Sequence, residues 1–343
     1  MNTAMRRFRI IWAVALMCVP MQGALAQTAT SRLVTAAKSF LSSLDAQQRA
    51  RVLFSFDDDK QRVRWSNFPN RIFQRAGLSL GELNARQRSA AMAVVAAALS
   101  RKGYEKILQI MEADEVLKAS ERNNPMFGKD LYFVSILGTP SLKDPWMLQF
   151  GGHHLALNVT VVGERGILTP TLTGAQPALY VVNGVTVRPL GRENDKAFAL
   201  LNALDATQRE QAILKYRVAD LVLGPGQDGK TIQPEGLKAS AMNAQQRAML
   251  LDLASEWTGI VHDSAAVARV QEIRAGLDDT WFAWSGPTTA AEGKNGTAYY
   301  RIQGPRLVIE YAPQGQRGGD ASMHIHTMYR DPTNDYGRGL ATK

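Results

Sequence analysis

The chain has 343 residues and a single cysteine, and its 40 Lys and Arg stand against 31 Asp and Glu for a formal net charge of +9. The basic excess is modest and shows no cluster of Lys and Arg interleaved with aromatic residues, which argues against a nucleic-acid groove. One cysteine excludes an internal disulfide framework, so stability must come from a buried core, which a chain of this length can build.

The first 26 residues have the pattern of a secretory signal. Arg6, Arg7 and Arg9 form a basic start, residues 10–19 form an apolar stretch, and small residues precede a cut at Gln27. The apolar stretch is too short to span a bilayer. We therefore predict that residues 1–26 are removed on export. The mature protein is then periplasmic or secreted and has no integral membrane segment.

One helix-start motif occurs four times, as LDAQQR, LNARQR, LDATQR and MNAQQR. Each places Asp or Asn at the N-cap and Gln three residues later, which is the pattern of a capping box. The N-caps are Asp45, Asn84, Asp205 and Asn243. An apolar run with helical spacing follows each motif, so each one predicts a helix.

The spacing of these motifs, with similar segments after each pair, indicates an internal duplication. The caps are 39 residues apart in the first pair and 38 in the second, and corresponding caps are 160 and 159 apart. A third helix is predicted at residues 103–119 and at 264–277. Strand-like segments rich in β-branched and aromatic residues then follow in both parts, at 129–162 and 278–313.

We therefore predict an α+β fold made of two tandem copies of a helices-then-antiparallel-strands unit packed about a pseudo-twofold axis. The first copy comprises residues 27–185 and the second residues 186–343, with the linker near residues 184–195. The strands of the two copies can form one shared sheet. The sequence leaves open whether the copies make one compact domain or two.

Four of the five histidines lie in two pairs near predicted strands, at His153, His154, His324 and His326. Side chains alternate along a strand, so the HIH segment places His324 and His326 on one face. The adjacent His153 and His154 can act together only in a turn, which the preceding glycines allow. All four are candidate ligands for a divalent transition metal, with zinc favoured and copper or iron as alternatives. The other interpretation is that these imidazoles only form hydrogen bonds at polar strand ends.

The histidine pairs are absent from the matching positions of the other copy. QGPRL stands opposite GGHHL, and approximately TPTLTGAQP stands opposite HIHTMYRDP. A polar cluster that the repeated scaffold does not share is more easily explained by function than by packing. We therefore expect the two pairs to meet at one site between the copies.

The residues after the second pair are candidates for a catalytic role. We expect Asp331 to orient a ligand or accept a proton, Arg330 to hold an anionic substrate group and Tyr329 to donate to an oxyanion. The alternative is turn chemistry, since Asp-Pro and Asn-Asp are strong turn formers.

Three segments, WSNFP, FGGHHLALN and HIHTMYRDPTNDYG, give the chain its resemblance to a family. It resembles the secreted bacterial family catalogued as domain of unknown function 3500, over nearly all of the mature chain. The resemblance implies one full-length family unit and an extracytoplasmic location. It implies no activity, because the family is uncharacterised.

The residues favour an exported metal-dependent enzyme, most simply a hydrolase in which a His-ligated metal activates water for attack on a small or anionic substrate. An oxidase with the same ligands is a weaker possibility. The alternative is a periplasmic binding or scaffold protein that captures a small anionic ligand at the histidines and Arg330 without turnover. No serine-hydrolase, HExxH, P-loop or dinucleotide motif decides between them.

Overall fold

The computed structural model describes residues 28–315 and 319–341. The predicted signal segment, residues 1–26, lies outside the described residues. Among the described residues, no helix has both the length and the hydropathy needed to cross a membrane.

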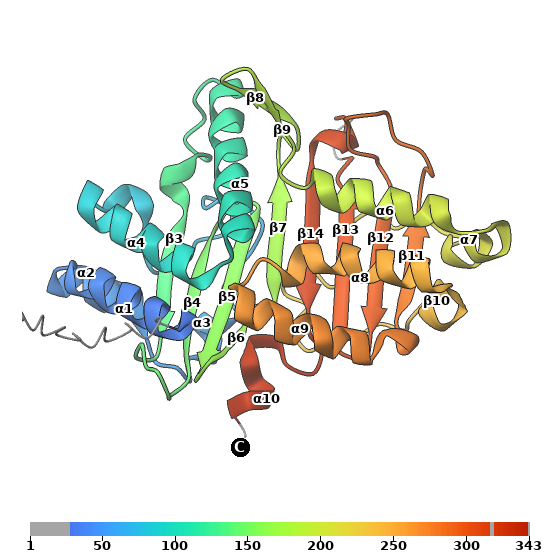
Figure 1. The fold of residues 1–343 in the computed structure, drawn as a ribbon. Coiled ribbons are helices and arrows are strands. Elements are labelled where there is room, and N and C mark those ends of the chain that lie inside the picture. The colour runs from blue at the N-terminus through green and yellow to red at the C-terminus, as the bar shows by residue number, and fades with distance from the viewer. Residues whose placement is uncertain (1–27, 316–318, 342–343) are drawn as a thin grey trace, which may run out of the picture.

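The described chain forms one large mixed sheet with helices packed on one face, which confirms the predicted α+β class (Figure 1). The sheet order is β1-β3-β4-β5-β7-β14-β13-β12-β11-β10, and the neighbours are antiparallel except for β1 and β3. β2 and β6 pair at its margins, and β8 and β9 form a separate hairpin. The helices are α1 (Ala29–Ser42), α2 (Ala46–Val52), α3 (Asp59–Arg62), α4 (Ala85–Ala98), α5 (Arg101–Ser120), α6 (Gly191–Ala203), α7 (Ala206–Ala212), α8 (Ala244–Thr258), α9 (Asp263–Ala275) and α10 (Arg338–Ala341). The strands are β1 (Leu53–Phe54), β2 (Leu78–Ser79), β3 (Phe133–Leu137), β4 (Trp146–Gly152), β5 (Leu155–Val162), β6 (Arg165–Ile167), β7 (Thr171–Ala175), β8 (Tyr180–Val182), β9 (Val185–Val187), β10 (Leu237–Lys238), β11 (Trp281–Ser285), β12 (Tyr299–Gly304), β13 (Leu307–Pro313) and β14 (Ile325–Arg330).

All four predicted capping boxes are present, at the starts of α2, α4, α7 and α8. The capping glutamines also pair with each other. Gln87 Nε2 donates to Gln48 Oε1 over 2.8 Å, and Gln246 Nε2 donates to Gln208 Oε1 over 2.7 Å. Each box therefore both starts its own helix and ties it to a neighbouring helix.

Two groups of strands meet at the centre of the sheet, where β7 pairs antiparallel with β14. The hydroxyls of Thr173 and Thr327 lie 2.7 Å apart across this junction, and Trp257 Nε1 of α8 donates to Thr327 Oγ1 over 3.0 Å. β5 flanks β7 on one side and β13 flanks β14 on the other. The turns β4–β5 and β12–β13 are therefore carried close to opposite ends of the central pair.

The two faces of the sheet have different surroundings. The helix-covered face contributes large apolar side chains to two core clusters, including Phe150, Trp284 and Tyr300. The other face is covered by irregular segments, residues 54–76, 213–236 and 331–337, which supply a smaller cluster with Trp65 and Met328. Buried polar groups gather under these segments, and the residues discussed next lie at one margin of that face.

Candidate metal centre

Strand β14 carries the HIH segment into the centre of the sheet. Ile325 and Tyr329 belong to the helix-side core, whereas Met328 packs under the irregular segments on the other face. Since side chains alternate along a strand, His324 and His326 lie with Met328 on that second face. Their Nε2 atoms are 3.0 Å apart, so the predicted same-face arrangement is present.

His153 and His154 are the two residues of the turn between β4 and β5, with Gly152 paired to Leu155 below them. His154 has a φ of 61°, a left-handed conformation that is uncommon for residues other than glycine and that recurs at functional sites. A Cβ on Gly152 would lie 2.8 Å from the ring of Tyr132, so glycine is required for the hairpin to approach that ring. The turn was predicted to be necessary, and it directs one of the two imidazoles toward β14.

The structure brings together three imidazoles from distant parts of the chain. His154 Nε2 lies 2.9 Å from His324 Nε2, and the candidate ligand atoms of His154, His324 and His326 all lie within 4.8 Å of one another. Two nitrogens bound to one tetrahedral zinc, at about 2.0–2.1 Å each, are about 3.3 Å apart. The two sides that meet at His324, 2.9 and 3.0 Å, are close to that value, and the third side is no longer than 4.8 Å.

Hydrogen bonding alone does not account for this contact. An imidazole nitrogen has one in-plane position, which carries either a proton or a lone pair. His324 Nε2 faces two other ring nitrogens at 2.9 and 3.0 Å and can pair with only one of them. A cation between the rings accepts a lone pair from each of the three nitrogens, which favours a metal over a chain of hydrogen bonds.

Burial keeps two of these rings, those of His154 and His324, neutral and therefore able to coordinate. It lowers the pKa of His154 well below the usual value, and the neighbouring histidines lower it further. Burial, followed by the charge of His326, lowers the pKa of His324 to about 3. Coordination requires an unprotonated imidazole, and both rings meet that condition at neutral pH.

The fourth predicted ligand, His153, does not belong to the triangle. Its Nδ1 lies 2.7 Å from the Asp114 carboxylate, which is buried on α5 and also accepts the backbone N–H of Gly128. Its ring instead packs on that of His154, with centroids 3.7 Å apart. His153 therefore supports the ligand next to it, and Asp114 fixes the orientation of His153.

Two polar side chains border the triangle on its more exposed side. Asn67 Nδ2 lies 3.4 Å from His326 Nε2, and an Asp220 carboxylate oxygen lies 3.7 Å from His326 Nδ1. Burial acts to raise the pKa of Asp220, but the nearby His326 and the hydrogen bonds from the backbone N–H of Leu221 and from Gln314 outweigh it, so the pKa is lowered. A carboxylate beside the outer nitrogen of a metal-bound histidine is a common orienting arrangement.

Arg75 holds the Asn67 segment against the histidine turn. Its Nη2 lies 2.6 Å from the carbonyl oxygen of Ser66 and 2.7 Å from that of Gly152. The backbone N–H of His154 donates to the Asn67 carbonyl over 3.2 Å. The WSNFP, GGHH and HIH segments are thus joined in one place.

The predicted catalytic residues lie elsewhere, at the far end of β14. Asp331 follows His326 by five residues, which places it roughly 16 Å away at about 3.3 Å per strand residue. It pairs there with Arg269 over 2.9 Å, and Tyr329 accepts a hydrogen bond from the same arginine. The length of the strand therefore separates Tyr329 and Asp331 from the histidine site.

Arg330 is also removed from the histidines. Its Nε donates to the Leu223 carbonyl and its Nη2 to the Gly224 carbonyl. Its Nη1 pairs with Asp335 over 2.8 Å and with Asp228 over 3.2 Å. All its nitrogens are used to bind irregular segments to the sheet, so the predicted role of Arg330 in holding a substrate anion is also corrected.

The sequence did not indicate that Asp114, Asn67 and Asp220 lie beside the histidines. Asn67 lies in the WSNFP segment, which was singled out only for its resemblance. Asp114 and Asp220 belong to a helix and to a long irregular segment with no local pattern that sets them apart. Only the packing of those segments brings them to the histidines.

Comparison with known proteins gives a family. The sequence model described as "Protein of unknown function (DUF3500)" matches residues 26–338, which confirms the predicted resemblance. No curated protein and no solved structure matches the chain.

Proposed function

Because the chain belongs to the DUF3500 family, whose description names no activity, we propose a function from the histidine triangle: His154, His324 and His326 bind a divalent transition metal, zinc by preference, that catalyses hydrolysis. One observation carries the proposal. Three ring nitrogens converge within 4.8 Å, and no fourth His, Cys, Asp or Glu of the described chain joins that group. Structural zinc sites have four protein ligands, whereas catalytic sites have three and an open position.

The surroundings of the triangle suit this use. A metal with an open position lowers the pKa of a bound water toward neutrality and so supplies a nucleophile. The side chain of Asp220 is 52% exposed beside His326, where it can orient that ring and accept a proton from the solvent side. We therefore assign Asp220 the acid–base role that the sequence suggested for Asp331.

The experiment compares the zinc-loaded full chain with a chelated sample on three probes: 4-nitrophenyl acetate, 4-nitrophenyl phosphate and bis(4-nitrophenyl) phosphate. Zinc-dependent turnover of one probe is expected, and it is lost in the variant with His324→Ala and His326→Ala. Asp220→Asn should keep the zinc and lower kcat at least tenfold, within the 10²–10⁴ range of general acid–base catalysis. Arg338→Gln, an exposed change away from the triangle, is the matched control.

The alternative is metal-dependent binding without turnover, by a periplasmic binding or scaffold protein. This alternative would be favoured over a hydrolase if the wild type bound stoichiometric zinc but turned over none of the three probes faster than the double variant does. The version in which Arg330 captures an anion beside the histidines has no support, since that guanidinium is already paired on every nitrogen.

We propose that the protein acts outside the cytoplasm after removal of residues 1–26. The basic start, the apolar stretch and the small residues before Gln27 support this. The mass of the protein recovered from the periplasm or medium tests it, because a chain that begins at Gln27 is expected and an uncut chain contradicts the proposal.

We also propose that the chain consists of two tandem copies, residues 27–185 and 186–343. Support comes from the repeated cap pairs and from matching hairpins, since Gly152 pairs with Leu155 in one part and Gly304 pairs with Leu307 in the other. An experimental structure tests the proposal. When the two parts are superposed, the two capping boxes and four strands of one part should align with the two capping boxes and four strands of the other. Failure of those elements to align would contradict it.

A further inference from the structure

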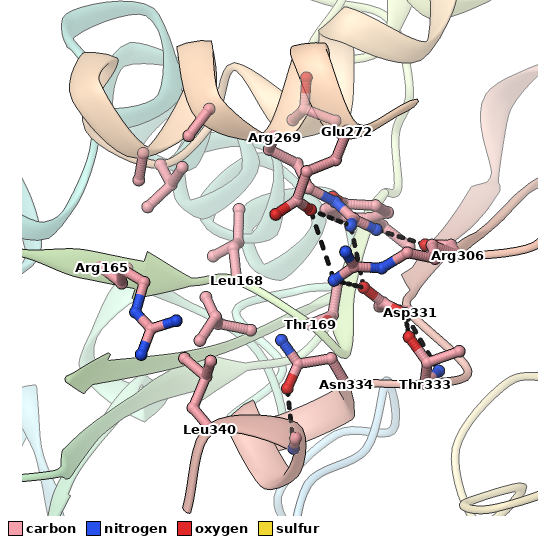
Figure 2. A pocket seen from close by; sticks show the side chains of 18 of the residues that line it. Arg165, Leu168, Thr169, Arg269, Glu272, Arg306, Asp331, Thr333, Asn334 and Leu340 are labelled. Atoms are coloured by element: carbon pink, nitrogen blue, oxygen red, sulfur yellow. Dashed lines mark hydrogen bonds and ion pairs between the residues drawn. The ribbon is translucent and has the colours of Figure 1, made fainter. Parts of the chain in front are cut away.

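A second candidate site lies at the other end of the central strand pair, away from the histidines. A cavity of about 420 Å³ opens between α9, β6 and the chain that follows β14. Figure 2 shows Arg306 and Asp331 on one side of it, Arg165 on the other and Leu340 of the C-terminal helix below. Its volume is within the usual range for small-molecule sites, about 300–1,000 Å³.

The interior of the cavity is mainly apolar. Ile167, Leu168, Val261, Ala265 and Leu340 contribute to its walls. Such a lining suits the hydrocarbon body of a ligand, because burying apolar surface is favourable by about 25 cal/mol per Å².

Three buried polar atoms in the walls lack a partner. They are the hydroxyl oxygens of Thr169 and Thr258 and Nε of Arg306. Thr169 and Thr258 are only 2% and 1% exposed, so bulk water does not solvate them freely. Buried polar groups are nearly always hydrogen-bonded, and the Nε–H of an arginine can only donate. The described chain supplies no acceptor to these three atoms, which belong to residues of the cavity walls.

The cavity walls carry three arginines and three carboxylates, whose ion pairs are unevenly distributed. Each acidic side chain in the walls has a partner: Asp331 and Glu272 accept from Arg269 over 2.9 and 2.8 Å, and Glu164 accepts from Thr28. Two of the arginines are less fully paired. Arg306 Nη2 lies at 3.4 Å from both Asp331 and Glu272. Arg165 has no ion pair within the described part of the chain, and it is exposed at the cavity.

Arg306 stands in the β12–β13 turn where His154 stands in the β4–β5 turn, each immediately before a leucine that begins the next strand. The two turns thus present different chemistry at opposite ends of one strand pair. The length of β14 separates the cavity from the histidine triangle.

We propose that this cavity binds a small amphipathic organic acid. Its carboxylate accepts hydrogen bonds from Arg306, whose side chain is partly exposed at the cavity, and its aliphatic or aromatic body packs against Leu168, Val261 and Leu340. A guanidinium binds a carboxylate through charge-assisted hydrogen bonds, which are stronger than neutral ones. The site is independent of the hydrolase proposed above, because it uses none of the histidines.

The test is calorimetric titration of the full chain with 4-phenylbutyrate, with 4-phenylbutanol as the neutral analogue and sulfate as the anion without an apolar body. The acid should bind one site per chain, at least tenfold more tightly than either analogue. Arg306→Gln is expected to weaken binding of the acid about tenfold or more.

Two further variants keep the test decisive if Arg306→Gln disturbs its ion pairs. Ala268→Trp, on an exposed part of α9 at the cavity, should block binding without changing a charge. Arg274→Gln removes an exposed charge from the same helix outside the cavity and should leave binding unchanged. The proposal is overturned if the acid does not saturate, if either analogue binds as tightly, or if Ala268→Trp binds normally. Zinc content of the same samples reports separately on the histidine site.

Discussion

At His324, one ring nitrogen meets two others at hydrogen-bonding distance, and a neutral imidazole can satisfy only one such contact. This arrangement favours a bound metal over hydrogen bonds alone. Desolvation also favours a metal, since it keeps His154 and His324 unprotonated. His153, although adjacent in sequence, is bound by Asp114 and lies behind His154. The two residues of one turn therefore have different roles.

That difference predicts unequal effects of substitution in the turn. His154→Leu removes a ligand and should abolish stoichiometric zinc binding. His153→Phe keeps a ring stacked on His154 but breaks the contact with Asp114, so zinc should still bind, about 10–100-fold more weakly. Competition with a chromophoric chelator measures both affinities. Equal losses in the two variants would contradict the assignment of His153 to a supporting role.

The lowered histidine pKa values also predict how the stability of the metal-free protein depends on pH. In the unfolded chain these rings titrate near 6.5, whereas folding lowers the pKa of His324 to about 3 and that of His154 well below normal. The unfolded state therefore binds more protons between about pH 3 and 6.5. The free energy of unfolding should therefore have its full value above that pH range, and it should fall as the pH is lowered through the range.

Urea unfolding of the metal-free protein at pH 7 and pH 4.5 measures this effect. The variant with His154→Leu and His324→Leu is the control for carboxylates that titrate in the same range. The wild type should lose more stability than this variant on acidification. An equal loss in both would show that the histidines do not contribute.

At the scale of elements, the close approach of β7 to the histidines depends on Gly174. Its backbone N–H donates to the His154 carbonyl over 2.7 Å. A Cβ at this position would lie 2.7 Å from the Ile325 carbonyl oxygen and 3.3 Å from the His154 side chain. The central strand pair and the histidine triangle thus share one tight contact.

Gly174→Ala should therefore weaken zinc binding and lower stability by about 1–3 kcal/mol, the usual cost of overpacking. Gly276→Ala is the matched control, because the nearest atom to its new Cβ is 3.8 Å away. Chelator competition and urea unfolding test both variants. Normal zinc affinity in Gly174→Ala would mean that the junction is not rigid at this point.

Local patterns explain which elements were predictable. The capping boxes at Asp45 and Asn243 depend on residues three positions apart, and the shared face of His324 and His326 depends on strand alternation. Asp220 and Asp114 reach the site only through tertiary packing, so no local pattern marks them. Asp331 differs in its cause: it is near His326 in sequence, but β14 (Ile325–Arg330) is extended and carries its two ends far apart.

At the scale of the whole molecule, the histidine triangle is assembled across the centre of the sheet. His154 comes from the first part of the chain, and His324 and His326 come from the second, joined where β7 meets β14. The sequence predicted that the two histidine pairs meet, because they are absent from the matching positions of the proposed repeat. It did not indicate the cavity at the other end, since that space depends on how α9 and the C-terminal helix pack.

The most direct test of the account is the metal content of the purified full chain after exposure to zinc and removal of the excess, measured by atomic emission. The three histidines predict about one zinc ion per chain, retained by Arg338→Gln and lost in the double variant His324→Ala with His326→Ala. A wild-type chain without stoichiometric metal, or a double variant that retains it, would contradict the metal centre.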